Sequence, residues 1–169
     1  MTEPKKVGVL ISGNGSNLQA LIDACKHEDF PARITAVISN KPDAYGLNRA
    51  SQAGIATHII DHKQHASRES FDEAVHNLLL HHNVEIVCLA GFMRLLTPLF
   101  VKRWHDKLIN IHPSLLPSFK GAHAHRDAIA AGVRISGCTV HFVRSEMDAG
   151  PIIVQAAVPV MPEDTEHSL

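Results

Sequence analysis

The segment "INIHPS" (109–114) places Asn110 and His112 two residues apart, directly before a proline. In a strand, alternate side chains point to the same face, so the amide and the imidazole can face one reacting oxygen. A histidine can donate or accept a proton near neutral pH, which suits general acid–base catalysis. The same pattern is also typical of a histidine that only holds the following loop by a hydrogen bond, and both interpretations stay open.

The segment "RSEMDAGP" (144–151) places Asp148 in a turn after an apolar strand. A carboxylate held beside His112 would favour the protonated imidazole, so Asp148 is a candidate third catalytic group. Asp-x-Gly is also common turn chemistry, and for this segment taken alone the turn is the better-supported interpretation.

A glycine-rich loop, "SGNGSN" (12–17), joins an apolar run to a helical pattern. Such a joint presents free backbone N–H groups and the positive end of a helix dipole. We therefore expect a small site for one phosphate, with polar contacts from Ser16 and Asn17. The alternative is a tight strand-to-helix turn that Ser16 caps.

Two larger phosphate motifs do not fit this loop. The dinucleotide fingerprint needs a third glycine where Leu18 stands, and an acidic residue where the second strand ends in Ser39 and Asn40. The Walker loop needs a Gly-Lys-Ser/Thr sequence, and this loop has no lysine.

The segment "LAGFMRLLTP" (89–98) is an apolar loop after a buried strand. At the carboxyl end of a central strand, its side chains could line a pocket for a flat aromatic ligand. They could equally cap the core of the sheet.

Metal binding is an alternative use of the histidines. His123 and His125 stand one residue apart, and His112, His141 and Asp148 could add ligands. The sequence has no Cys pair and no HExxH spacing, so we expect no metal.

Composition excludes several function classes. The 169 residues are 45% hydrophobic and 20% charged, which is typical of a globular domain. The formal net charge of -1 gives no support to nucleic-acid or membrane-surface binding. The three cysteines lie far apart in apolar segments, and "MTEPKK" leads straight into a strand, so we expect a cytoplasmic protein with no signal peptide.

Strand and helix patterns alternate along the chain, which predicts a single α/β domain with a doubly wound, mostly parallel sheet. The expected strands are 7–12, 33–39, 55–60, 84–92, 107–114, 137–143 and 151–160, and the expected helices are 18–25, 44–54, 70–79, 98–104 and 126–132. Ser70 and Glu73 have the spacing of a capping box. The end, "MPEDTEHSL", is typical of a helix opening with Asp164 or Thr165 as N-cap.

Four segments occur here in the order found in glycinamide ribonucleotide transformylases of purine biosynthesis: "ISGNGSNLQAL", "AGFMRLL", "NIHPSLLPSF" and "GCTVHFV…MDAGPII". The chain resembles this family over essentially its whole length, so residues 1–169 are expected to form one formyltransferase domain with a Rossmann-like fold. "NIHPSLLP" alone is similar to the wider formyltransferase superfamily, including formyltetrahydrofolate deformylase and methionyl-tRNA formyltransferase.

The resemblance implies a role for each matched residue. The activity would be transfer of a formyl group from 10-formyltetrahydrofolate, the co-substrate, to the amine of glycinamide ribonucleotide. Asn110, His112 and Asp148 would be catalytic, stabilising a tetrahedral intermediate without a metal. Gly15, Ser16 and Asn17 would hold the ribonucleotide phosphate. The implied folate contacts are Arg68, Met93, Arg94, Leu95, Leu96, Asn110, Arg144, Ser145, Glu146, Met147 and Asp148.

The resemblance also implies a helical segment after Leu169 with further ribonucleotide contacts, so we expect the sequence to lack that part. Lys120 stands where the family usually has a proline, a change expected to loosen the loop. The implied partners are small-molecule substrates, not nucleic acid or membrane, and a homodimer is left open.

Two other functions remain to be weighed. A hydrolase could release formate from formyltetrahydrofolate with the same three catalytic residues, although a water nucleophile needs no phosphate anchor. A phosphate-ligand sensor without catalysis would leave Asn110 and His112 without a task.

Overall fold

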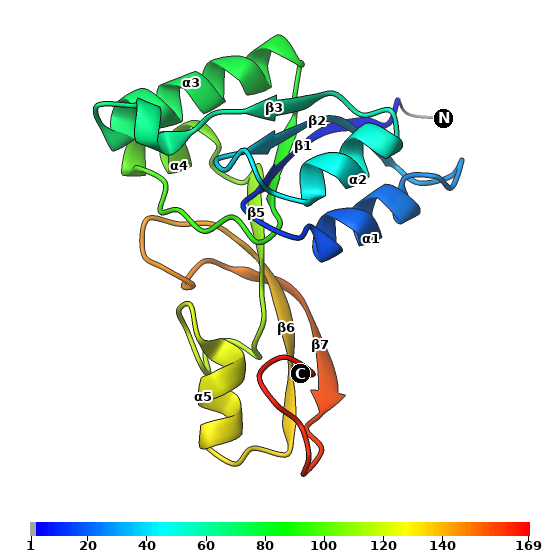
Figure 1. Cartoon of the computed structure of the whole chain (residues 1–169), viewed down its shortest axis with the longest axis vertical. Helices are drawn as coiled ribbons and strands as arrows, with labels where there is room; N and C mark the ends of the chain where they lie inside the picture. Colours follow the sequence, from blue (N-terminus) through cyan, green and yellow to red (C-terminus); the bar gives the residue numbers. More distant parts are fainter. Residues whose placement is uncertain (1–2) are drawn as a thin grey trace. The chain divides into compact units, whose positions relative to one another are not determined.

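The computed structural model describes residues 3–169. The chain forms two compact units, one ending at Leu108 and one spanning Ile109–Leu169. Figure 1 shows the first unit in blue to green and the second in green-yellow to red.

The first unit is built from parallel strands and helices. Its elements are β1 (Lys5–Ile11), α1 (Ser16–Ala24), β2 (Ala32–Ser39), α2 (Gly46–Gln52), β3 (Thr57–Ile59), the 3-10 helix η1 (His62–Gln64), α3 (Arg68–His81), β4 (Ile86–Leu89) and α4 (Pro98–Arg103). Strand β1 pairs in parallel with β2 and β4, and β2 pairs in parallel with β3. Because these crossovers run in two directions from β1, α1 and α2 lie on one face and α3 and α4 on the other (Figure 1).

The core of the first unit explains why these residues form strands. Val9, Leu10 and Ile11 are completely buried, as expected for a central strand covered on both faces. Leu18 and Ile22 bury the inner face of α1.

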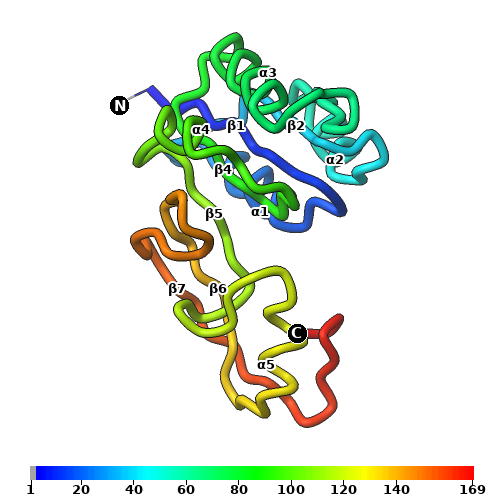
Figure 2. The backbone as a smooth tube through the Cα atoms, turned by 90° about the vertical axis from the view of Figure 1, so that its left-hand side faces the viewer, coloured from blue at the N-terminus to red at the C-terminus, as the bar shows by residue number. Residues whose placement is uncertain are grey.

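The second unit is a small antiparallel assembly. It contains β5 (Leu108–His112, starting at the unit boundary), α5 (Ala124–Ala130), β6 (Ile135–Phe142) and β7 (Ile152–Pro159). Strand β6 pairs antiparallel with both β5 and β7. The backbone trace in Figure 2 follows β6 and β7 side by side, with α5 between β5 and β6 in the chain.

Over the described residues, the strand order is β3-β2-β1-β4-β5-β6-β7. The predicted α/β class with a mostly parallel sheet is therefore confirmed. No helix within residues 3–169 is both long and apolar enough to cross a bilayer.

The predicted capping box of α3 was wrong. The helix begins at Arg68, and Ser67 is its N-cap, exchanging hydrogen bonds with Ser70. Glu73 instead forms an ion pair with Arg103 at 2.5 Å. The true capping box has Ser70 at the third helical position, where Glu or Gln is usual. The Ser70/Glu73 spacing therefore pointed to Ser70 as the N-cap in place of Ser67.

Three further boundaries differ from the prediction. Strand β4 is shorter, because the apolar residues after Leu89 form a loop. Helix α5 starts at Ala124, two residues earlier than expected, so the preceding loop is shorter. After β7, Thr165 accepts the backbone N–H of Ser168, but only turns follow Met161 and no helix is formed by these residues.

Candidate active site

His112 ends β5 and is 4% exposed. Its Nε2 lies 2.8 Å from the carbonyl oxygen of Phe119. A carbonyl oxygen only accepts, so Nε2 carries a proton and donates it. Nδ1 lies 3.5 Å from Oδ1 of Asp148. Both ring nitrogens therefore face oxygen acceptors, an arrangement that suits two N–H donors.

Asn110 lies on the same face of β5, two residues before His112, as predicted. Its Nδ2 donates to Nε2 of His141 at 3.3 Å, because an amide nitrogen has no lone pair to offer. Nδ1 of His141 then donates to the carbonyl oxygen of Phe142 at 3.0 Å. His141 is 2% exposed and fixes the amide of Asn110.

Asp148 has a backbone φ of 51°, in the left-handed region that non-glycine residues rarely adopt. Its Oδ2 accepts the backbone N–H of Gly121 at 2.9 Å. The turn requires Gly150, since a Cβ there would lie 1.6 Å from the carbonyl oxygen of Phe142. Asp148 is thus more than a turn residue: the turn directs its carboxylate at His112.

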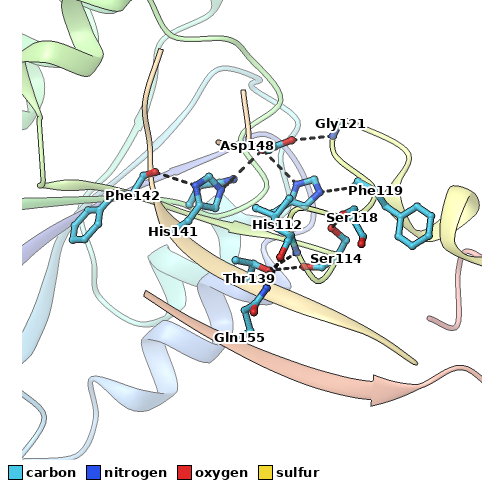
Figure 3. A network of polar contacts seen from close by, with 12 residues as sticks. His112, Ser114, Ser118, Phe119, Gly121, Thr139, His141, Phe142, Asp148 and Gln155 are labelled. Atoms are coloured by element: carbon cyan, nitrogen blue, oxygen red, sulfur yellow. Dashed lines mark hydrogen bonds and ion pairs between the residues drawn. The ribbon is translucent and has the colours of Figure 1, made fainter. Parts of the chain in front are cut away.

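The loop after His112 is held by a buried hydroxyl that the sequence did not single out (Figure 3). Oγ1 of Thr139 donates to the carbonyl oxygen of Ser114 at 2.7 Å and accepts the N–H of Leu116 at 3.0 Å. Nε2 of Gln155 contacts the same Oγ1 and the carbonyl oxygen of Leu116. These bonds fix the path of the chain toward Phe119.

The glycine-rich loop lies in the first unit. Helix α1 begins at Ser16, and its N-cap is Gly15 with a φ of 75° and no side-chain cap. The reading of Ser16 as a cap was therefore wrong. The first backbone N–H groups of a helix have no acceptor within it, so those of Ser16 and Asn17 remain available for an anion.

Helix α2 supports this loop from behind, a contact that the sequence did not reveal. A Cβ at Gly15 would lie 2.7 Å from Cα of Gly46. Arg49 donates from Nε to the carbonyl oxygen of Asn14 at 2.8 Å and from Nη2 to its Oδ1 at 3.1 Å. These contacts tie α2 to the glycine-rich loop.

The loop 92–96 exposes apolar side chains. Met93 is 71% exposed and Leu95 56% exposed, so the alternative that they cap the core was wrong for these two residues. Phe92 stacks on Phe71, and the guanidinium of Arg94 lies 4.7 Å from the same ring. The buried ring of Phe71 thus holds the loop through Phe92 and Arg94, while the side chains of Met93 and Leu95 are exposed.

The other predicted folate contacts lie at the start of α3 and in the loop between β6 and β7. Arg68 is the exposed first residue of α3. Arg144 lies in the second unit with its guanidinium 5.7 Å from the Phe142 ring, and Met147 is 55% exposed. Ser145 and Glu146 are also exposed.

Of the residues considered as metal ligands, His112 and His141 both lie near Asp148, at 3.5 Å and 4.0 Å from its Oδ1, whereas His123 and His125 belong to α5. Within residues 3–169, no group of three or more His, Cys, Asp or Glu side chains has the geometry to hold a metal ion. His123 is the N-cap residue of α5, and His125 lies in its first turn.

The site thus combines an amide and a histidine on β5 with a carboxylate from the turn after β6. Residues 5–169, a range that crosses both units, match the formyl transferase family. The chain belongs to this family, and the predicted formyltransferase fold is confirmed.

Comparison with individual proteins narrows the family to particular relatives. The chain is 52% identical to phosphoribosylglycinamide formyltransferase of Escherichia coli (strain K12), over 95% of this chain and 76% of that protein. It is 57% identical to the trifunctional purine biosynthetic protein adenosine-3 of Chironomus tentans, over 98% of this chain. A crystal structure of glycinamide ribonucleotide transformylase 1 from Symbiobacterium toebii has a TM-score of 0.96 and 46% identity, covering 99% of this chain and 79% of that one.

The lengths of these relatives differ greatly. The chain spans only 12% of the Chironomus tentans protein and 17% of the corresponding Gallus gallus protein.

Proposed function

We propose that the chain transfers a formyl group from 10-formyltetrahydrofolate to the amine of glycinamide ribonucleotide. Family membership and the similarity to phosphoribosylglycinamide formyltransferases support the reaction class. The observation that carries the proposal for this chain is the buried His112, with acceptors on both ring nitrogens and Asn110 beside it on β5.

The reaction joins an amine to a formyl carbon. The lone pair of the glycinamide amine attacks that carbon, and the formyl oxygen gains negative charge in a tetrahedral intermediate. The second N–H of the Asn110 amide and the Nδ1–H of a protonated His112, which Asp148 contacts only at 3.5 Å, would donate to this oxygen, an effect worth about 3–4 kcal/mol per donor in comparable sites. The C–N bond to the folate then breaks, and the folate nitrogen receives a proton.

Asp148 is assigned to His112 in this scheme. Its Oδ1 faces Nδ1 of His112, which supports the charged ring. A water held by this carboxylate would carry the proton from the attacking amine to the departing nitrogen.

The two substrates are assigned to separate binding elements. The phosphate of the ribonucleotide would bind the N–H groups of Gly15, Ser16 and Asn17, where the helix dipole favours an anion. The pterin ring of the folate has broad faces that suit the exposed side chains of Met93 and Leu95, and a polar edge that can bond the main chain around Leu96. Arg68, Arg94 and residues 144–148 are proposed as its remaining contacts.

The function is tested by product analysis. The purified protein is incubated with 10-formyltetrahydrofolate, with and without glycinamide ribonucleotide, and both formylated ribonucleotide and formate are quantified by mass spectrometry. We expect formylated ribonucleotide to accumulate in step with loss of the folate. Formate release at the same rate with or without the ribonucleotide would favour the hydrolase and overturn the proposal.

A further inference from the structure

A buried serine links the two loops of the first unit that are proposed to bind substrates. Ser12 follows β1 and is 4% exposed. Its hydroxyl donates to Oδ1 of Asn40 at 2.5 Å. The same oxygen accepts the backbone N–H of Met93 at 2.8 Å. The single hydroxyl proton and a lone pair are therefore both used.

The two residues joined by this hydrogen bond, Ser12 and Met93, belong to the two loops proposed to bind substrates. Ser12 is the first residue of the glycine-rich loop 12–17, and Met93 lies in the apolar loop 92–96. The hydroxyl thus ties the end of β1 to the loop after β4, at the carboxyl ends of neighbouring parallel strands.

Asn40 completes the network from β2. It is 2% exposed, so Oδ1 has no ready access to water when its partner is lost. Nδ1 of His62 lies 3.1 Å from the carbonyl oxygen of Asn40 and 3.3 Å from its Nδ2, so the His62 ring packs against both the backbone and the amide of Asn40. Because Oδ1 of Asn40 only accepts, the proton of the Ser12 hydroxyl points at it.

We infer that Ser12 is a positioning residue, which sets the geometry of the glycine-rich loop and of loop 92–96 together. This inference rests on the proposed function for its kinetic consequence. Alanine at this position would leave the N–H of Met93 and Oδ1 of Asn40 without their partner. The hydrogen bond that joins the glycine-rich loop to the apolar loop would then be lost. Ser12 itself is not among the proposed substrate contacts.

The chain offers a matched control in Ser39. This serine ends the neighbouring strand β2 and is completely buried. Its hydroxyl also makes two hydrogen bonds, donating to the carbonyl oxygen of Lys41 and accepting the N–H of Lys41. Ser39→Ala thus removes an equally buried hydroxyl that bonds neither proposed binding loop.

The experiment compares Ser12→Ala, Ser12→Thr and Ser39→Ala in the whole chain. For Ser12→Ala we expect KM to rise about tenfold for both substrates, with a smaller change in kcat, since one hydrogen bond is worth about a factor of ten in an equilibrium. Ser12→Thr keeps the hydroxyl and should restore both KM values. Ser39→Ala should lower Tm comparably while leaving both KM values near wild type.

A second measurement does not depend on activity. Amide hydrogen exchange should show loss of protection at Met93 in Ser12→Ala and not in Ser39→Ala. If wild-type protein transfers no formyl group but this loss is seen, the proposed function fails and the link between the loops stands. Unchanged exchange at Met93, or KM values that respond alike to Ser12→Ala and Ser39→Ala, would overturn the inference.

Discussion

Asp148 and His112 face each other across 3.5 Å, Oδ1 against Nδ1, although 35 residues separate them in the sequence. The opposite nitrogen of the ring donates to Phe119, and the opposite oxygen of the carboxylate accepts from Gly121. Each partner is thus held on its far side by backbone, which fixes the pair without help from solvent.

Asp148→Asn should reduce kcat by about 100-fold or more, because a neutral amide no longer supports the charged ring of His112. The change is nearly isosteric, so the fold should remain. Steady-state formyl transfer measures the effect, with Asp127→Asn as a control at a half-exposed carboxylate that pairs with its neighbour Arg126. A kcat within threefold of wild type would remove Asp148 from the mechanism.

Gly15→Val should weaken ribonucleotide binding by about tenfold or more, since a left-handed backbone is costly for a residue with a side chain. The new Cβ would also meet Cα of Gly46 at 2.7 Å. Folate binding should change far less, because its proposed contacts lie elsewhere. Binding titrations with each ligand measure both effects, and equal loss of the two would contradict the phosphate assignment.

Cys88 should resist alkylation in the folded protein. Burial, reinforced by the nearby Cys25, raises the pKa of the Cys88 thiol to about 12. At about pH 8 only about one thiol in 10,000 is then a thiolate, the reactive form. Iodoacetamide labelling followed by peptide mass spectrometry should leave Cys88 unmodified in native protein and modify it in urea. Rapid native labelling would show that this strand is less buried than described.

His58 should make the folded state less stable in acid. Burial, and then repulsion from His82 and His81, lower the pKa of His58 below its ordinary 6.5. The unfolded chain therefore binds a proton more readily, so this contribution to stability is complete above 6.5 and is lost as pH falls through the lower folded pKa. Thermal unfolding between about pH 7.5 and 5.5 measures this loss of stability, because the interval spans the neutral and the protonated states of the His58 ring in the unfolded chain.

The control for this prediction is His58→Gln, which cannot titrate. Its Tm should fall less than that of wild type over the same interval, although burial of His76 lowers the pKa of that ring as well and leaves a residual slope. An identical pH dependence in both proteins would exclude His58 as a source of the effect.

The sequence predicted those features that depend on local periodicity. Asn110 and His112 share a face because strand side chains alternate, and the apolar run before Gly13 is buried on both sides. The helix expected over 44–54 closes at Gly54, two residues after α2 ends, with a φ of 72° typical of a helix C-terminal glycine.

Local periodicity could not predict contacts between segments that lie far apart in the sequence. Nothing near Arg49 in the sequence points to Asn14, and nothing near Thr139 points to the loop after His112. His141 was considered only as a metal ligand, whereas it orients the amide of Asn110. Such supports are buried polar residues on other strands and helices, so only the fold brings them to the site.

The most direct test of the central claim is the rate of formyl transfer by His112→Ala, measured beside His105→Ala, which replaces an exposed histidine. We predict that His112→Ala lowers kcat by about 1,000-fold or more, because the hydrogen bond to the developing oxyanion and the associated proton chemistry are lost together. His105→Ala should retain wild-type kcat. Turnover by folded His112→Ala within tenfold of wild type would contradict the account.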